Sequence, residues 1–267
     1  MKRVLITGAE GIVGTVLRTR LADRYELRLL TFTQCDFPSM VADIADFSSM
    51  LAAVEGMDAV IHLAAAADLD ITWGQVLNSN LIGVYNTFEA SRQAGVKRIV
   101  FASSNHVIGM LEEDAGPSIY ELTDPRVYDA HVDVRPDSMY AVSKVFGEAI
   151  GRFYSDRYAI EVICVRIGSC PPQNDPRFAS VAGLNLTPEE QYKRRRAAWL
   201  SHRDCAQLFT RCLEASRIRW ALVYGTSNNP RQFWDLTDAR DILGYAPEDS
   251  APVEAAELGT AAHGGER

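Results

Sequence analysis

A short apolar run near the N-terminus ends in the sequence Thr7-Gly8-Ala9-Glu10-Gly11-Ile12-Val13-Gly14. Residues 3–7 read as a buried strand and residues 11–23 have helical spacing, so the glycines stand at a strand-to-helix turn. There Gly8 permits a tight turn, Gly11 lets the backbone approach a pyrophosphate, and Gly14 lets the helix pack closely on the sheet. Free N–H groups at the helix start attract phosphates. The stretch therefore predicts a dinucleotide-binding loop in preference to a plain tight turn.

Strand and helix patterns continue to alternate after this loop. Strand-like runs occupy residues 26–32, 58–63, 97–102 and 160–166, and helical patterns occupy residues 47–54, 75–94 and 139–157. Repeated βα units predict an α/β fold of the Rossmann type, a doubly wound parallel sheet with helices on both faces. The order is less regular later, with helices near 188–199 and 204–215 and a strand at 220–224. We expect a dinucleotide-binding domain over residues 1–166, a small C-terminal substrate-binding lobe over 167–250, and a peripheral tail over 251–267.

Composition excludes several function classes. The 267 residues include 35 acidic and 27 basic side chains, so the net charge of −8 disfavours nucleic acid as a partner. Apolar runs are too short to span a membrane, so no membrane partner is expected. The five cysteines are odd in number and form no Cys-x-x-Cys pair, which favours reduced thiols and a cytoplasmic location. Metal-ligand spacing is absent from the sequence, so no metal is predicted.

A tyrosine and a lysine four residues apart stand on the helical pattern of residues 139–157. Tyr140 and Lys144 share one helix face, and a nearby ammonium favours the phenolate form and lowers the pKa of a tyrosine. Ser104 follows the strand-like run 97–102, at the edge of the sheet where doubly wound folds carry their chemistry. Tyr140, Lys144 and Ser104 are therefore the predicted catalytic residues.

The end of the second strand leaves the choice of cofactor open. An acid there holds the ribose 2′-hydroxyl of NAD, but residues 29–34 contain no acid, and no basic residue stands ready for a 2′-phosphate. Thr31 is placed to hydrogen-bond either group, and Asp43 and Ile44 are placed to touch the adenine. The predicted cofactor is NAD or NADP, with NAD favoured.

These motifs together resemble the extended short-chain dehydrogenases, the NAD-dependent epimerase/dehydratase group, over roughly residues 2–250. The matching features are the glycine loop, Asp43, His62-Leu63-Ala64-Ala65, Asn80, Ser104 and the Tyr140/Lys144 pair. Within this group the chain is similar to uronate dehydrogenases at residues 101–106 and 165–170. It is similar to the archaeal glucose-6-phosphate dehydrogenases of this fold at residues 199–206 and 223–229.

The resemblance implies oxidation of C1 of a cyclic sugar to a lactone. Tyr140 would be the base, Lys144 would lower its pKa and bind the nicotinamide ribose, and Ser104 would orient the C1 hydroxyl. Asn105, His106 and Ser169 would contact the sugar, and Arg194 stands where uronate dehydrogenases grip the carboxylate. A sugar-contacting serine of those relatives is Ala67 here, with Asp68 and Asp70 close by. The implied cofactor contacts are Gly8, Glu10, Gly11, Ile12, Gly14, Thr31, Asp43, Ile44, Leu63, Ala64, Ala65, Asn80, Ser103, Tyr140, Lys144 and Ile167.

Two further segments carry charge. The basic run Lys193–Arg196 either grips an oxyanion or forms the solvated face of a helix, with Arg194 the candidate to enter the site. The long acidic connection over residues 105–136 is expected to be a lid or an insertion, and it argues against a very anionic substrate if it covers the site.

The sequence therefore predicts an enzyme, an NAD(P)-dependent dehydrogenase that oxidises a hexose 6-phosphate, a uronate or a similar acidic sugar. One alternative is a nucleotide-sugar epimerase or dehydratase that keeps NAD tightly bound. Another is a non-catalytic dinucleotide sensor, against which the Tyr140/Lys144 pair counts. The resemblance also implies a homodimer or a larger homo-oligomer.

Overall fold

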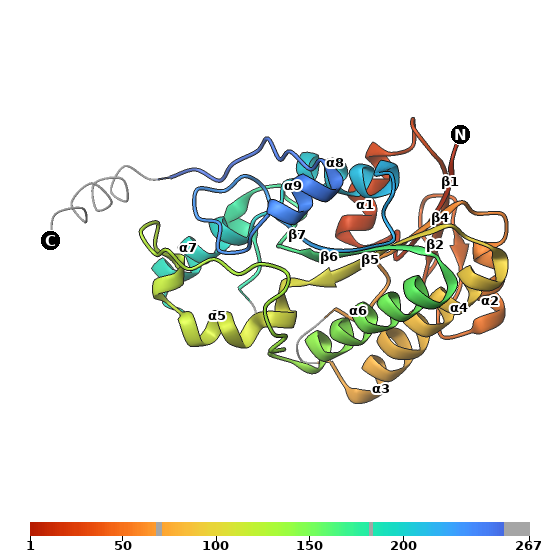
Figure 1. The fold of residues 1–267 in the computed structure, drawn as a ribbon, viewed down its shortest axis with the longest axis horizontal. Helices are drawn as coiled ribbons and strands as arrows, with labels where there is room; N and C mark the ends of the chain where they lie inside the picture. The colour runs from red at the N-terminus through yellow and green to blue at the C-terminus, as the bar shows by residue number, and fades with distance from the viewer. Residues whose placement is uncertain (68–70, 182–183, 254–267) are drawn as a thin grey trace, which may run out of the picture.

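A computed structural model of the chain describes residues 1–67, 71–181 and 184–253 (Figure 1). Asp68 and Asp70, and all but the first three residues of the expected tail, lie outside these ranges.

The centre of the molecule is one sheet of seven strands that all run parallel. The order is β3-β2-β1-β4-β5-β6-β7, so the chain starts in the interior of the sheet and winds outward in both directions. The predicted doubly wound parallel sheet is confirmed. The strands are β1 (Arg3–Thr7), β2 (Glu26–Thr31), β3 (Met40–Val41), β4 (Ala59–His62), β5 (Arg98–Ser104), β6 (Glu161–Ile167) and β7 (Trp220–Gly225).

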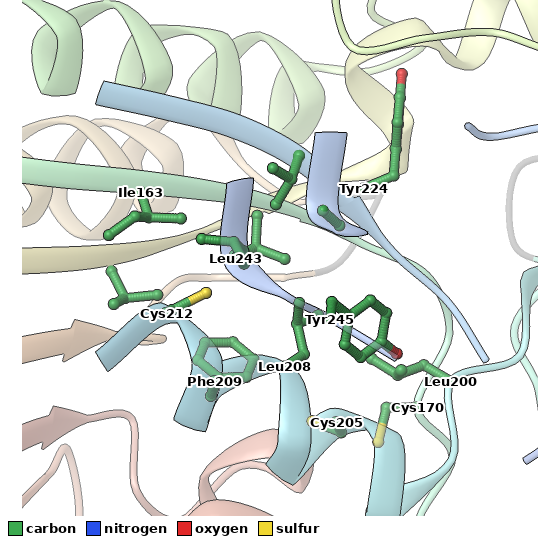
Figure 2. Packing of buried hydrophobic residues seen from close by; sticks show 14 of the residues in the cluster. Ile163, Cys170, Leu200, Cys205, Leu208, Phe209, Cys212, Tyr224, Leu243 and Tyr245 are labelled. Carbon is green, nitrogen blue, oxygen red and sulfur yellow. The ribbon is translucent and has the colours of Figure 1, made fainter. Parts of the chain in front are cut away.

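Helices cover both faces of the sheet, and each face has its own apolar core (Figure 1). On one face lie α2 (Phe47–Val54), α4 (Gly83–Ala94) and α6 (Met139–Tyr158). On the other lie α1 (Ile12–Arg20), α8 (His202–Glu214) and α9 (Thr237–Leu243). Figure 2 shows Leu208, Phe209 and Cys212 of α8 close to Ile163 of β6, and all four side chains are fully buried. Burial of these apolar surfaces is the main force holding the layers together.

The helix expected over residues 75–94 is interrupted. It consists of α3 (Trp73–Gln75), a π-helical segment η1 (Val76–Ile82) and then α4. Hydrophobic spacing predicts helix in general and does not distinguish a π turn from an α turn. Single π turns often occur at functional sites, and this one contains Asn80.

The two long connections contain short helices that the sequence patterns did not reveal. The first holds η2 (Asn105–Ile108), α5 (Gly109–Ala115) and η3 (Ser118–Tyr120), and the second holds η4 (Pro176–Phe178). After the second comes α7 (Pro188–Ala198), which begins with a capping box formed by Thr187 and Glu190.

The expected division at residue 166 does not interrupt the sheet. Residues beyond it supply β7, which pairs with β6, and α8, which packs against α1. A separate C-terminal substrate-binding lobe therefore stays a prediction. It would have to be formed by the connections that lie outside the sheet, at the carboxyl ends of its strands. Of the helices in the described ranges, none combines the length and apolarity that crossing a bilayer requires.

Candidate active site

A cleft of about 790 Å³ lies at the carboxyl ends of the central strands. It is lined from the glycine loop after β1, the segment after β4, the end of β5, the start of α6 and the segment after β6. Doubly wound sheets bind their ligands at this edge, where the strand order reverses.

The glycine loop brings backbone against backbone at one end of the cleft. A Cβ on Gly8 would lie 2.8 Å from the backbone nitrogen of Ala64, and Gly8 has a φ of 68°, which favours glycine. A Cβ on Gly14 would lie 2.4 Å from the carbonyl oxygen of Gly8. Gly11 is the N-cap of α1 and provides no side-chain cap, so the first N–H groups of the helix face the cleft without a side-chain acceptor. This cradle fits a pyrophosphate.

The three predicted catalytic residues come together further along the cleft. Lys144 is buried and donates from Nζ to the carbonyl oxygen of Ala102 over 2.7 Å. Its Nζ lies 5.4 Å from the ring centroid of Tyr140. The Ser104 side chain interacts with the Tyr140 hydroxyl closely enough to lower its pKa, and both residues line the cleft. The cluster thus brings together the hydroxyl of Ser104, the phenol of Tyr140 and the ammonium of Lys144.

Burial dominates the titration of this cluster. It raises the pKa of Tyr140 to about 12, against the lowering effect of Ser104. It lowers the pKa of Lys144 to about 8. Loss of hydration outweighs the effect of Ser104, so the net pKa of Tyr140 is raised; the expected lowering by Lys144 stays a prediction.

The other end of the cleft is polar. His106 contacts Asp137, with 2.6 Å between Nδ1 and Oδ2. Ser169 accepts a hydrogen bond from the backbone nitrogen of Ser180. With its amide oriented to satisfy both neighbours, Asn105 donates to the Ile167 carbonyl and accepts from Arg194 Nη2 over 3.1 Å. Asn105, His106, Ser169 and Arg194 all line the cleft.

Of the basic run on α7, only Arg194 lines the cleft. It is 2% exposed and forms an ion pair with the equally buried Glu112 of α5, with 2.8 Å between Nε and Oε1. Lys193 instead pairs with Glu121 and Glu189. Arg196 stacks on Tyr192 and donates to the carbonyl of Pro252.

Two predicted cofactor contacts do not line the cleft. Thr31 is fully buried and its hydroxyl pairs with Ser39, because the side chain of Thr31 faces away from the cleft wall that Leu30 and Phe32 form. The side-chain amide of Asn80 forms its hydrogen bonds within the protein. It accepts from the backbone nitrogen of Ala66 and donates to the carbonyl oxygen of Ala66 and to Ser143 Oγ. It positions the segment after β4 against α6.

Sequence reasoning also missed part of the lining. Ser103 lines the cleft as predicted, but its hydroxyl donates to Glu148. The unpredicted lining residues are Val13, Leu30, Phe32, Ala42, Ala66, Ala67, Gln75, Ser79, Ala102, Gly168, Cys170 and Ser180. Several of these stand beside predicted residues, so extending each motif by one or two positions finds them. Gln75 and Ser180 carry no such signal.

His62 is a buried residue that holds the start of the segment after β4. Thr7 Oγ1 accepts from the N–H groups of Leu63 and Ala64, so its own proton is donated to His62 Nδ1 over 2.8 Å. The proton of the neutral imidazole is thereby assigned to Nε2. Burial, aided by the charge of Lys144, lowers the pKa of His62 to about 3.

The chain matches the family model described as "NAD dependent epimerase/dehydratase family" over residues 4–174. It is 36% identical to an NAD-dependent glucose-6-phosphate dehydrogenase of Haloferax volcanii, over 93% of this chain and 94% of that protein. It is also 36% identical to an L-arabinose 1-dehydrogenase (NAD(P)+) of the same organism, over 94% and 98% of the two chains.

A solved structure is similarly close. A mutant uronate dehydrogenase from Agrobacterium tumefaciens, complexed with NAD, superposes with a TM-score of 0.77 at 35% identity. The match covers 94% of this chain and 86% of that one.

The burial of neutral His62 should make stability depend on pH. Below about pH 6.5 the His62 imidazole of the unfolded chain binds a proton, whereas that of the folded chain stays neutral down to about pH 3. The free energy of unfolding therefore rises with pH between these two values. This contribution is complete above pH 6.5 and is lost as the pH falls, with a slope of up to about 1.4 kcal/mol per pH unit. Urea unfolding of wild type and His62→Gln from pH 4.5 to 7 should give the variant the shallower slope.

The matched control for this change is His131→Gln, since His131 is 74% exposed and should leave the slope unchanged. Equal slopes for wild type and His62→Gln would refute the assignment.

Proposed function

The chain belongs to the NAD-dependent epimerase/dehydratase family, and from that premise we propose that it oxidises C1 of a cyclic sugar to the lactone. The observation that carries the proposal is the cluster of Ser104, Tyr140 and Lys144 beside the glycine loop in one cleft. Three related proteins, named for glucose 6-phosphate, L-arabinose and uronate, support this reaction class.

The cleft has the residues to hold NAD. The pyrophosphate would lie on Gly8, Gly11 and Gly14, where an added Cβ would collide with backbone or approach it closely. The adenine would contact Asp43 and Ile44, and the nicotinamide ribose would reach Lys144. When bound, the nicotinamide supplies the acceptor for the hydride that leaves C1.

The protein's own groups handle the proton. Ser104 Oγ would hydrogen-bond the C1 hydroxyl and orient it toward the Tyr140 hydroxyl, which lines the same cleft. Tyr140 Oη would then take the proton as phenolate. Lys144 keeps its ammonium near the ring at neutral pH, since its pKa is about 8, and its charge favours the phenolate.

We further propose that NAD is the preferred cofactor because Glu10 supplies the acid missing after β2. Oε1 of Glu10 accepts the backbone N–H of Phe32 over 2.7 Å, which fixes the carboxylate at the end of β2. Both residues line the cleft. The second carboxylate oxygen could accept from a ribose 2′-hydroxyl, and its charge would repel a 2′-phosphate.

A homodimer is proposed on the outer face of α4 and α6. Tyr85 of α4 and Val142, Phe153 and Tyr158 of α6 are each more than 40% exposed, an unusual concentration of apolar surface. The two helices lie beside each other in Figure 1.

Light scattering should give twice the mass of the chain. Phe153→Glu should lower that mass, whereas Phe178→Glu, another exposed phenylalanine, should not; a monomeric wild type would contradict the proposal.

A reducing compartment such as the cytoplasm suits the thiols. Cys170 and Cys205 are neighbours in the apolar core (Figure 2), yet both are free, as are Cys35, Cys164 and Cys212. An oxidising compartment would favour joining such a pair.

Replacement of Tyr140 tests the reaction. Tyr140→Phe should lower kcat at least about hundredfold while dinucleotide binding is kept, because only the proton acceptor is removed. Wild-type kcat/KM should rise from pH 6 to 8, since the phenolate fraction grows as the pH approaches the raised pKa of Tyr140. The assay is nicotinamide reduction with a panel of aldoses, uronates and sugar phosphates.

Tyr25→Phe is the control, because the Tyr25 hydroxyl bonds Glu214 outside the cleft. Full activity of Tyr140→Phe would refute its role. Turnover of no sugar by the wild type, with NAD retained after dialysis, would instead support an epimerase or dehydratase.

Replacement of Glu10 tests the cofactor preference. Glu10→Lys should tighten NADP and weaken NAD, each by about tenfold in Kd, because a charge that repels the 2′-phosphate becomes one that attracts it. Calorimetry with the two dinucleotides measures this without turnover. Glu26→Lys, at the opposite end of β2, should leave both Kd values unchanged. An unaltered ratio in Glu10→Lys would contradict the assignment.

A further inference from the structure

The buried ion pair between Arg194 and Glu112 bears on the chemistry of the substrate. Arg194 lines the cleft, and Asn105, the neighbour of Ser104, accepts from its Nη2. The guanidinium therefore lies close to the reacting end of the sugar site. Glu112 is 3% exposed and approaches Arg194 through both oxygens, at 2.8 Å from Nε and 3.3 Å from Nη2.

Glu112 is held in this position from a second side. Tyr120 donates its hydroxyl to Oε1 of Glu112 over 3.0 Å, and burial raises the pKa of Tyr120, so the hydroxyl stays a donor. Glu112 and Tyr120 both belong to the acidic connection over residues 105–136. The connection thus places a carboxylate against Arg194, behind the wall of the cleft.

The donors of Arg194 are almost fully used. A guanidinium has five N–H groups. Within the described ranges, Glu112 takes Nε–H and one Nη2–H, Asn105 takes the other Nη2–H, and the carbonyl of Ser180 takes one Nη1–H. One N–H of Arg194 is left, whereas a bidentate interaction with a carboxylate or phosphate needs two parallel N–H groups.

The other basic side chains lining this cleft, among the residues described, are His106 and Lys144. His106 contacts the carboxylate of Asp137, and Lys144 donates to the Ala102 carbonyl beside Tyr140. Arg194 and His106 thus each face a carboxylate of the protein. An oxyanion on the sugar would meet those carboxylates as well, and the loss of its hydration would not be fully compensated.

We propose that Glu112 is a specificity-determining residue: by neutralising Arg194, it makes the site select a neutral aldose over the corresponding uronate or sugar phosphate. The inference rests on the proposed C1 oxidation and narrows its substrate class. It departs from the expectation that Arg194 grips an acidic group. The remaining N–H of Arg194 suits a single bond to a sugar hydroxyl.

The test compares sugars that differ in one group. D-Glucose and D-glucuronate differ only at C6, as do D-galactose and D-galacturonate. Wild-type kcat/KM should favour the neutral member of the productive pair by tenfold or more. Glu112→Gln keeps the shape and the acceptor oxygen but removes the charge, so it should shift the ratio toward the uronate by at least tenfold.

Glu113→Gln is the matched control, since it makes the same change at an adjacent exposed carboxylate and should leave the ratio unchanged. A wild-type preference for the uronate, or an unmoved ratio in a folded Glu112→Gln, overturns the inference. If Glu112→Gln does not fold, the wild-type ratio alone decides.

Failure of the proposed reaction is separable from failure of the inference. If the wild type oxidises no sugar of these pairs and none of the wider panel of aldoses, uronates and sugar phosphates, C1 oxidation is refuted. Ligand-observed NMR titration of the same pairs then measures selectivity directly, and tighter binding of the uronate overturns the inference as well.

Discussion

The close contact between the loop after β1 and the first turn of α1 fixes the rest of the site. Neither Gly8 nor Gly14 has room for a side chain, so α1 begins directly against the end of the sheet. Because all strands are parallel, the carboxyl ends of β1, β4, β5 and β6 meet at this same edge. Ser104 at the end of β5 and Lys144 near the start of α6 therefore both lie at this edge of the sheet.

Much of this arrangement could be predicted from the sequence because its signals are local. The glycine spacing, the apolar strand runs and the i, i+4 pair of Tyr140 and Lys144 each depend on a few neighbouring residues. What stayed hidden depends on orientation or distance. Thr31 and Phe32 differ only in the face of the strand end that they occupy, and a shift of one residue reverses it. The titration of Tyr140 follows from burial, which spacing does not reveal.

The Glu112–Arg194 pair shows how a contact between residues far apart in the chain escapes prediction from local sequence patterns. Its partners are 82 residues apart in the chain, in two charged segments whose sequences do not indicate that they meet. Tertiary packing turns one arginine of a basic run inward and brings a single acid of an acidic connection to meet it. Whether a charge in a sequence is solvated, paired or free to bind a ligand is decided at this level.

The late arrival of β7 has a consequence for synthesis. The interior residues of β6, Val162 to Val165, are fully buried, and β7 pairs with the backbone of β6 along its outer edge. A ribosome makes more than fifty residues after β6 before β7 is complete, and α8 is made within that interval. Until then the nascent chain presents an apolar strand with unpaired backbone groups, the kind of edge that recruits other chains. The interval between these two strands is thus a stage of synthesis at which the edge of β6 is open to pairing with other chains.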